Sequence, residues 1–253
     1  MPDLNNRGVR IHYEVEGDGQ PLVLQHGFVQ SIDSWREFGY VEALRSDYRL
    51  ILIDARGHGA SDKPHDPAAY DMALRASDVV AVLDALGIEQ AHYLGYSMGG
   101  RISFDTAKLA PERLRSLLIG GSHPYAVDGQ VVHAPQFRDG MAAWLERQPL
   151  PEHILTPSLR AQVLANDPEA LMAASVYRPS LEDILPTLTM PCLAYAGGDD
   201  PARPQVEDWV KVAPRATLTI LPGLDHWAGM YRSDLVLPHV RAFLERAASE
   251  SSV

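Results

Sequence analysis

The feature that most constrains this chain is the segment from Gly95 to Gly100, which reads Gly-Tyr-Ser-Met-Gly-Gly. A short apolar run, residues 91–94, precedes it, and a helical pattern, residues 101–109, follows it. A strand, a sharp turn and a helix in this order expose the hydroxyl of Ser97, with a helix N-terminus directly behind it. An ordinary glycine-rich turn looks the same in isolation, so the rest of the chain decides whether Ser97 is catalytic.

Short apolar runs and helical patterns alternate on both sides of this segment. Besides residues 91–94, strands are expected over 9–15, 21–25, 48–53, 115–119, 190–196 and 216–221. Helices are expected over 31–45, 71–86, 101–109, 204–212 and 233–248. Buried strands joined by helical crossovers favour a mostly parallel sheet covered by helices on both faces. The predicted fold class is therefore α/β, in a single domain over residues 1–253.

The alternation stops between residues 123 and 186. This stretch contains only helical pieces separated by prolines, over 137–147, 159–164 and from 167 to about 177. Because both ends return to the same sheet, the stretch is predicted to be a small helical cap inserted into the domain. The core would then consist of residues 1–122 and 187–253.

The charge balance and the cysteine content restrict the partners and the compartment. A net charge of −11 opposes binding to nucleic acid or to an anionic membrane surface. The one cysteine, Cys192, cannot form an intrachain disulfide, and neither a signal peptide nor a membrane-spanning apolar run is recognisable. We therefore expect a cytoplasmic protein with a small-molecule substrate and no nucleic-acid or membrane partner. The sequence leaves the oligomeric state open.

A serine hydroxyl is a poor nucleophile, so it needs a base within hydrogen-bond reach and a third group that orients the base. His226 is the candidate base, because it follows the last predicted strand and so lies at the same sheet edge as Ser97. Strand 190–196 ends in two carboxylates, Asp199 and Asp200. Asp200 is the favoured acid, because it directly precedes a proline and lies three residues after the first glycine; Asp199 remains the alternative.

Attack on a carbonyl also requires donors for the oxyanion that develops on it. The backbone amide of Met98, at the start of the predicted helix, is one candidate. The second is the amide of Phe28, in the loop His26-Gly27-Phe28 that follows strand 21–25, where Gly27 lets the backbone approach closely. His26 is then expected to be structural.

Together these residues resemble the α/β hydrolases, from about residue 8 to residue 247. Four landmarks carry the resemblance: His26-Gly27 with Trp35 downstream, Asp54-x-Arg56-Gly57-His58-Gly59-x-Ser61, Gly95-x-Ser97-x-Gly99-Gly100, and Gly197-x-x-Asp200 with His226. The resemblance implies an α/β-hydrolase fold, a scaffold role for Arg56 and His58, and hydrolysis of esters or lactones without a metal or an organic cofactor. Relatives that cleave haloalkanes or epoxides carry an aspartate at the nucleophile position, so Ser97 argues against both activities.

The substrate is the least constrained part of the prediction. Tyr125 and Trp144 are candidate pocket walls, together with Phe137, Met141, Leu145, Leu155, Met172 and Tyr177, although at least half of this set is expected to form only the core of the cap. Arg101 lies one helical turn beyond Ser97 and is a third candidate substrate contact. An apolar pocket of modest size suggests a small acyl or aryl ester, or a lactone.

Two other functions remain open. The segments from Gly95 to Arg101 and from Gly121 to Pro124 also resemble the menaquinone-pathway synthase, a cofactor-free lyase that eliminates pyruvate and holds carboxylates with arginines. In that case Arg101 would bind a substrate carboxylate, whereas the cap arginines Arg138, Arg147 and Arg160 are scattered and form no obvious clamp. The other alternative is a small-molecule receptor of the same fold with slow or no turnover.

Overall fold

The apolar runs of the sequence form the central strands of one sheet. In the computed structural model, which describes residues 3–148, 150–152 and 154–250, this sheet has the strand order β1-β2-β4-β3-β5-β6-β9-β10. The strands from β4 to β10 are parallel, and β1 and β2 are antiparallel at one edge. The bounds are β1 Asp3–Asn6, β2 Val9–Glu16, β3 Gln20–Gln25, β4 Tyr48–Ile53, β5 Ala91–Tyr96, β6 Leu114–Gly120, β9 Cys192–Gly197 and β10 Ala216–Leu221. The predicted mostly parallel sheet is confirmed.

The helices lie in the crossovers between strands and in one insertion. The bounds of the α-helices are α1 Ile32–Glu37, α2 Tyr40–Leu44, α3 Met72–Ala85, α4 Met98–Leu109, α5 Gly129–Val132, α6 Gly140–Glu146, α7 Pro157–Leu164, α8 Pro168–Ala174, α9 Arg203–Val210, α10 Ala228–Tyr231 and α11 Ser233–Glu250. Four short 3-10 helices are η1 Pro67–Tyr70, η2 Pro111–Arg113, η3 Ala134–Phe137 and η4 Glu182–Thr187 within the described residues.

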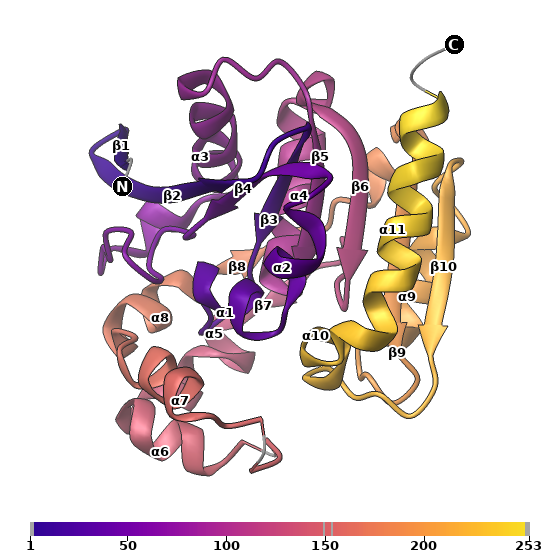
Figure 1. The fold of residues 1–253 in the computed structure, drawn as a ribbon. Helices are drawn as coiled ribbons and strands as arrows, with labels where there is room; N and C mark the ends of the chain where they lie inside the picture. Colours follow the sequence, from indigo (N-terminus) through magenta and orange to yellow (C-terminus); the bar gives the residue numbers. More distant parts are fainter. Residues whose placement is uncertain (1–2, 149, 153, 251–253) are drawn as a thin grey trace.

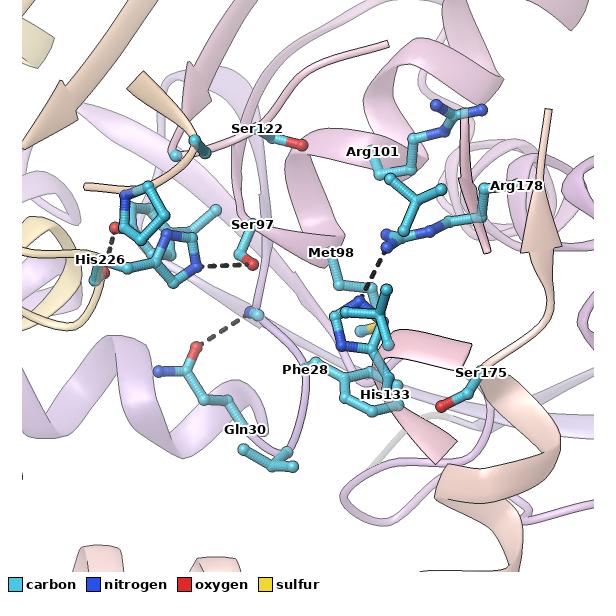
Figure 2. Close-up of a pocket in the computed structure, with 18 of the residues that line it drawn as sticks. Phe28, Gln30, Ser97, Met98, Arg101, Ser122, His133, Ser175, Arg178 and His226 are labelled. Carbon is cyan, nitrogen blue, oxygen red and sulfur yellow. Dashed lines mark hydrogen bonds between the residues drawn. The ribbon is translucent and has the colours of Figure 1, made fainter. Parts of the chain in front are cut away.

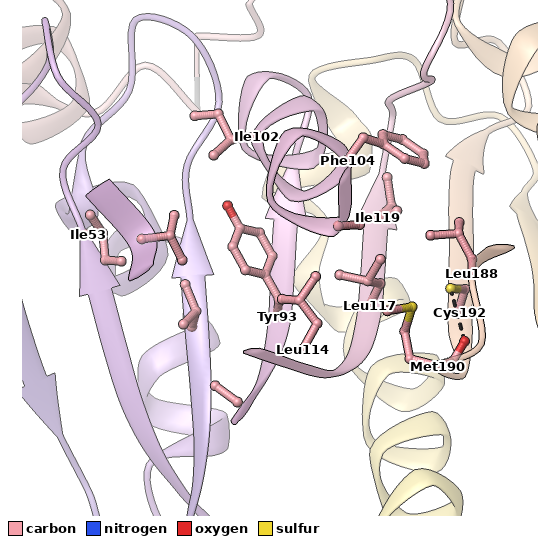
Figure 3. Packing of buried hydrophobic residues seen from close by; sticks show 14 of the residues in the cluster. Ile53, Tyr93, Ile102, Phe104, Leu114, Leu117, Ile119, Leu188, Met190 and Cys192 are labelled. Atoms are coloured by element: carbon pink, nitrogen blue, oxygen red, sulfur yellow. Dashed lines mark hydrogen bonds between the residues drawn. The ribbon is translucent and has the colours of Figure 1, made fainter. Parts of the chain in front are cut away.

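Both faces of the sheet are covered because successive residues of a buried strand point to opposite sides. On one face Val23 and Ile51 pack with α3, α4 and α9, and on the other Leu22 and Leu50 pack with α1, α2 and α11. Figure 3 shows part of the first core, where the side chains of β5 and β6 point toward the helix that carries Ile102. These two cores hold the strand ends in fixed positions.

The structure differs from the prediction in the first crossover, at the sheet edge and in the cap, where the helix expected over 137–147 is replaced by η3 and α6. The helix expected over 31–45 is divided into α1 and α2, because Gly39 between them has a φ of +79° that does not continue a helix. The edge strand β1 was not predicted, since its four residues Asp-Leu-Asn-Asn are partly exposed and too few to show a pattern.

The insertion between β6 and β9 contains α5 to α8 and a small antiparallel sheet of β7 Val127–Asp128 and β8 Tyr177–Arg178. It has an apolar core of its own, in which Phe137, Trp144 and Leu171 are buried. In Figure 1 the arrowheads of β6 and β10 point toward the end of the molecule where α6 to α8 lie. We call this insertion the cap. Residues 149 and 153 of the predicted cap, and 1–2 and 251–253 of the predicted domain, lie outside the described residues.

Among the described residues, no helix combines the length and the apolar character that crossing a membrane requires.

Candidate active site

The turn between β5 and α4 holds Ser97 in a strained backbone conformation. Ser97 has φ +51° and ψ −108°, a region that residues other than glycine rarely adopt. The flanking glycines make the turn possible, because a Cβ on Gly99 would lie 1.9 Å from the carbonyl oxygen of Gln25, and one on Gly95 would lie 2.4 Å from that of Gly99. The turn is anchored by the amide of Ser97, which donates to the carbonyl of Gly120 at 2.8 Å.

Three polar side chains from three strand ends form a continuous chain of hydrogen bonds. Nε2 of His226 lies 2.9 Å from Oγ of Ser97 (Figure 2). Nδ1 of the same imidazole lies 2.9 Å from Oδ2 of Asp200. The side chain of Asp200 is fully buried, and its other oxygen accepts the amide of Ala202 at 2.8 Å. A carboxylate at Nδ1 keeps the proton on that nitrogen, so Nε2 is left to accept the serine hydroxyl.

The two other carboxylates near His226 point elsewhere. Asp199 is exposed, and its amide donates to the carbonyl of Leu224. Asp225 accepts the amide of Ala228 at 2.7 Å, at the start of α10. The structure therefore brings Asp200, and neither neighbour, to the imidazole.

The loop that carries His226 is fixed to the sheet from two sides. The hydroxyl of Tyr96, the residue before Ser97, donates to the backbone carbonyl of His226. Gly197, at the end of β9, packs so closely that a Cβ there would lie 2.0 Å from the carbonyl of Leu224. These contacts hold the imidazole beside Ser97 even though 129 residues separate them in sequence.

The loop after β3 brings Phe28 to the cavity, and the first turn of α4 brings Met98 to it. Gln30 closes this loop, because its Oε1 accepts the amide of Gly27 at 2.9 Å. Val29 has φ +61°, and its carbonyl accepts the side-chain amide of Asn166 from the cap at 2.9 Å. Neither the Phe28 nor the Met98 amide donates a hydrogen bond within the part of the chain that the structure describes. Both are thus available to a substrate oxygen.

The remaining motif residues support the site from behind. His26 is fully buried, its Nδ1 donates to the carbonyl of Gly27 at 2.8 Å, and its Nε2 accepts the amide of Ala55 at 3.1 Å. Burial lowers the pKa of His26 below its ordinary value and lowers that of His58 to about 3, so both rings are neutral near pH 7. Arg56 forms two 2.7 Å bonds to Asp78. These contacts fit the scaffold role expected from the sequence.

The cavity in front of Ser97 has a volume of about 540 Å³ and is lined by Tyr125, Phe137 and Trp144 of the cap. Of the other candidate walls, Met141, Leu145, Leu155 and Met172 pack in the cap core, and Tyr177 is exposed. Arg101 is at the wall but only 2% exposed, and its guanidinium donates to the carbonyls of Pro124 and Tyr125 at 2.8 and 3.1 Å. Its donors hold the ends of the cap in place.

Among the cavity residues that sequence reasoning did not single out are Arg178 and His133. The guanidinium of Arg178, in β8, lies 3.1 Å from Nε2 of His133. The cap arginines that the sequence singled out, Arg138, Arg147 and Arg160, are exposed instead. No local signal marks Arg178, because it reaches the cavity through the pairing of β7 with β8, two strands of only two residues each.

Comparison with known proteins identifies the family of the chain. The sequence model that describes the alpha/beta hydrolase fold matches residues 20–244. The chain belongs to the α/β hydrolase family. It is 30% identical over 256 residues to the dihydrolipoyllysine-residue acetyltransferase component of an acetoin cleaving system from Pseudomonas putida. That match covers 92% of this chain and 66% of the relative.

It is also 34% identical over 119 residues to a putative 2-succinyl-6-hydroxy-2,4-cyclohexadiene-1-carboxylate synthase from Bacillus subtilis. That match covers 46% of this chain and 42% of the relative. The α/β hydrolase described here thus matches less than two thirds of the length of each of these curated relatives. A putative carbamate hydrolase and epoxide hydrolases are also among the relatives.

Solved structures of the family superpose closely. An esterase from Thermogutta terrifontis has a TM-score of 0.84 and 24% identity, and the match covers 97% of both chains. An enol-lactonase from Burkholderia xenovorans has a TM-score of 0.83 and 22% identity, and the match covers 96% of this chain and 100% of that one. At these identities the likeness shows the shared fold.

Proposed function

We propose that this α/β hydrolase cleaves small carboxylic esters or lactones through an acyl-enzyme intermediate on Ser97. The observation that carries the proposal is the unbroken chain of hydrogen bonds from Asp200 through His226 to Ser97, each 2.9 Å long. In this arrangement a serine hydroxyl meets a base that is already oriented and whose proton-accepting nitrogen faces it.

In the first half of the reaction, Oγ of Ser97 attacks the carbonyl carbon while its proton passes to Nε2 of His226. The carbonyl electrons move to the oxygen, which the amides of Phe28 and Met98 stabilise. When the tetrahedral intermediate collapses, the bond to the leaving oxygen breaks and the imidazolium gives that oxygen its proton. Asp200 stabilises the imidazolium throughout without taking its proton.

In the second half, His226 takes a proton from water, and the resulting hydroxide attacks the acyl carbon. Collapse returns the proton to Oγ of Ser97 and releases the carboxylic acid. For a lactone, the leaving oxygen stays attached to the acyl group, so the product is a hydroxy acid. No step in this sequence requires a metal ion or an organic cofactor.

The size and lining of the cavity support a small substrate. A volume of about 540 Å³ with Phe137 and Trp144 in its wall is typical of sites for small organic molecules. The similarity to an esterase and an enol-lactonase points to the same class of reaction. Epoxide cleavage in this fold relies on an aspartate at the position of Ser97, which this chain lacks.

The direct test is hydrolysis of p-nitrophenyl butyrate by the intact protein and by Ser97→Ala. We expect rapid release of p-nitrophenol, and a loss of at least about 10⁴-fold in kcat for the variant, since the nucleophile is removed while the fold remains. Equal rates in the two proteins would refute the proposal.

The second candidate is the pyruvate-eliminating lyase, which the match to the Bacillus subtilis synthase favours. It would use Ser97 and His226 to abstract a proton, and arginines to hold the substrate carboxylates. The engagement of Arg101 with cap carbonyls weighs against a direct role of that residue. Pyruvate release from a succinylated cyclohexene carboxylate, without release of p-nitrophenol from the ester, would favour the lyase over the esterase.

A further inference from the structure

The cavity wall is positively charged although the protein is strongly acidic. The chain has 22 Lys and Arg residues against 33 Asp and Glu residues. Nevertheless Arg75, Arg101 and Arg178 all line the cavity, and Asp200 is the only acidic residue among the described lining residues. Because Asp200 already binds His226 and the amide of Ala202, it does not neutralise the arginines.

One carboxylate behind the wall, Asp105, forms ion pairs with two of the three guanidinium groups, and its charge also acts on the third, Arg178, without an ion pair. Asp105 lies 2.8 Å from Nη2 of Arg75 and 3.5 Å from Nε of Arg101. The remaining donors of Arg101 bind backbone carbonyls at the ends of the cap, including that of Pro179. Two of the three arginines therefore have fixed partners and a structural reason to be there.

Arg178 has no such partner. It forms no ion pair with a carboxylate in the described ranges 3–148, 150–152 and 154–250, and the hydrogen bond found for its side chain goes to Nε2 of His133 at 3.1 Å. Because the guanidinium can only donate, His133 accepts the bond and is neutral. Burial and the charge of Arg178 lower the pKa of His133 to about 4. Burial and the nearby Arg75 and Arg101 lower the pKa of Arg178 to about 10, an effect that the charge of Asp105 partly offsets, so it remains a cation near pH 7.

This cation lines the same cavity as Ser97 and is connected to the site of the proposed chemistry through His133 and Phe28. The ring of His133 packs against that of Phe28 with 6.1 Å between centroids, and the Phe28 amide is one of the two proposed oxyanion donors. In Figure 2, Arg178 and His133 lie on one side of Ser97, and His226 lies on the other. A ligand that places its carbonyl at Ser97 thus extends toward Arg178 when it occupies that side of the cavity.

We propose that Arg178, oriented by His133, binds a carboxylate of the substrate, so that the ester or lactone cleaved here bears a free carboxylate close to the scissile bond. This inference rests on the proposed hydrolysis. A guanidinium that shares one carboxylate charge with two other arginines, and forms no ion pair of its own among the described residues, is matched by an anion that supplies the missing partner. Because Arg75 and Arg101 already pair with Asp105 and Arg178 pairs with no carboxylate among the described residues, one guanidinium is left for an anion, and a monoanionic carboxylate fits this position better than a phosphate dianion.

The test compares two esters that differ in this charge alone. The p-nitrophenyl monoester of succinic acid carries a terminal carboxylate, and p-nitrophenyl 4-oxopentanoate has a methyl group in place of the charged oxygen. We expect kcat/KM for the charged ester to exceed that for the neutral one by about ten- to a hundredfold, the range typical of a charge-assisted hydrogen bond. The glutaric monoester and its methyl ketone analogue extend the test by one methylene.

Arg178→Gln should abolish this preference, mainly through KM of the charged ester, and Arg178→Lys should restore part of it. Arg160→Gln is the matched control, because it removes the same charge from an exposed position of the cap. The ratio of kcat/KM for the charged ester to that for the neutral ester should be the same in this variant as in the unmodified protein. Because Arg178 repels two neighbouring cations, its removal should not lower Tm. A fall in Tm together with an unchanged preference would show a structural role and overturn the proposal.

A second measurement separates this inference from the proposed hydrolysis. Isothermal titration of Ser97→Ala with succinate and with glutarate should show binding that the additional change Arg178→Gln removes. If succinate or glutarate binds in this Arg178-dependent way but the unmodified protein cleaves neither ester, the result would support the carboxylate site and refute the hydrolysis. Rapid cleavage of both esters without preference, in a protein that binds neither diacid, would refute the carboxylate site and retain the hydrolysis.

Discussion

The sheet edge and the cap wall face each other across one cavity, but their polar groups are organised in opposite ways. At the sheet edge, Asp200, His226 and Ser97 are each hydrogen-bonded, and each follows the end of a strand packed in the core. At the cap wall, Arg178 is held by a two-residue strand and by a neutral histidine, without a carboxylate partner among the described residues. Under the two proposals above, the reaction chemistry belongs to the packed core, and selection of the substrate belongs to the cap.

The largest expected effect tests the assignment at the sheet edge. Asp200→Asn removes the charge that holds the imidazole tautomer, so kcat on p-nitrophenyl butyrate should fall by about 10³- to 10⁴-fold. Asp199→Asn is the matched control, since Asp199 is adjacent in sequence but exposed; kcat should change by less than about threefold. Steady-state kinetics of the two variants show which of the two carboxylates orients His226. A larger loss in Asp199→Asn would transfer the acid role to that residue.

An intermediate effect is expected where the two regions touch. Asn166 in the cap donates to the carbonyl of Val29, in the loop after β3 that carries the proposed oxyanion donor Phe28. Asn166→Ala should loosen this loop and lower kcat by about tenfold, less than the loss of a donor itself, with little change in KM. Thr156→Ala is the control, because it weakens the start of α7 without touching the loop; its kcat should stay within about twofold. Equal losses in both variants would indicate general destabilisation of the cap.

The smallest effect is expected near the amino-terminal end of the central strand β5, at the end of the sheet away from Ser97. Burial lowers the pKa of His92 to about 4, below the value near 6.5 of an unfolded chain. The unfolded state then binds more protons, so the free energy of unfolding should fall as the pH drops from about 6.5 toward about 4.

His92 alone should contribute about 1 kcal/mol of this loss between pH values of about 7 and 5.5. Urea unfolding of the unmodified protein and of His92→Gln at these two pH values measures the contribution, and esterase activity near pH 7 should be unaffected. An equal pH dependence in both proteins would contradict a neutral His92 in the folded state.

The sequence predicted the sheet edge better than it predicted the cap wall. The strand ends could be located because apolar runs, glycines and polar residues lie within a few positions of each other, as in the segment ending at Asp200. These local patterns were enough to bring Ser97, Asp200 and His226 to one edge of the predicted sheet. Asp200 could be preferred to Asp199, but only the folded loop shows which of the two carboxylates turns inward.

The cap could not be predicted at the same level. Its existence followed from the absence of buried-strand runs, but β7 and β8 are too short to show any periodicity. Arg101 was a candidate because it lies near Ser97 in sequence, whereas its donors bind protein carbonyls. Arg178 lies 81 positions from Ser97, and the contacts that bring it to the cavity are tertiary.

The most direct test of the central claim is to identify the residue that a fluorophosphonate ester labels, by mass spectrometry of the intact protein and of its peptides. Such a reagent reacts with an activated serine and leaves a stable mimic of the tetrahedral intermediate. The account predicts one adduct, on Ser97, whose formation is slowed strongly by His226→Gln. An adduct on a different residue, or labelling of Ser97 at the same rate without His226, would contradict it.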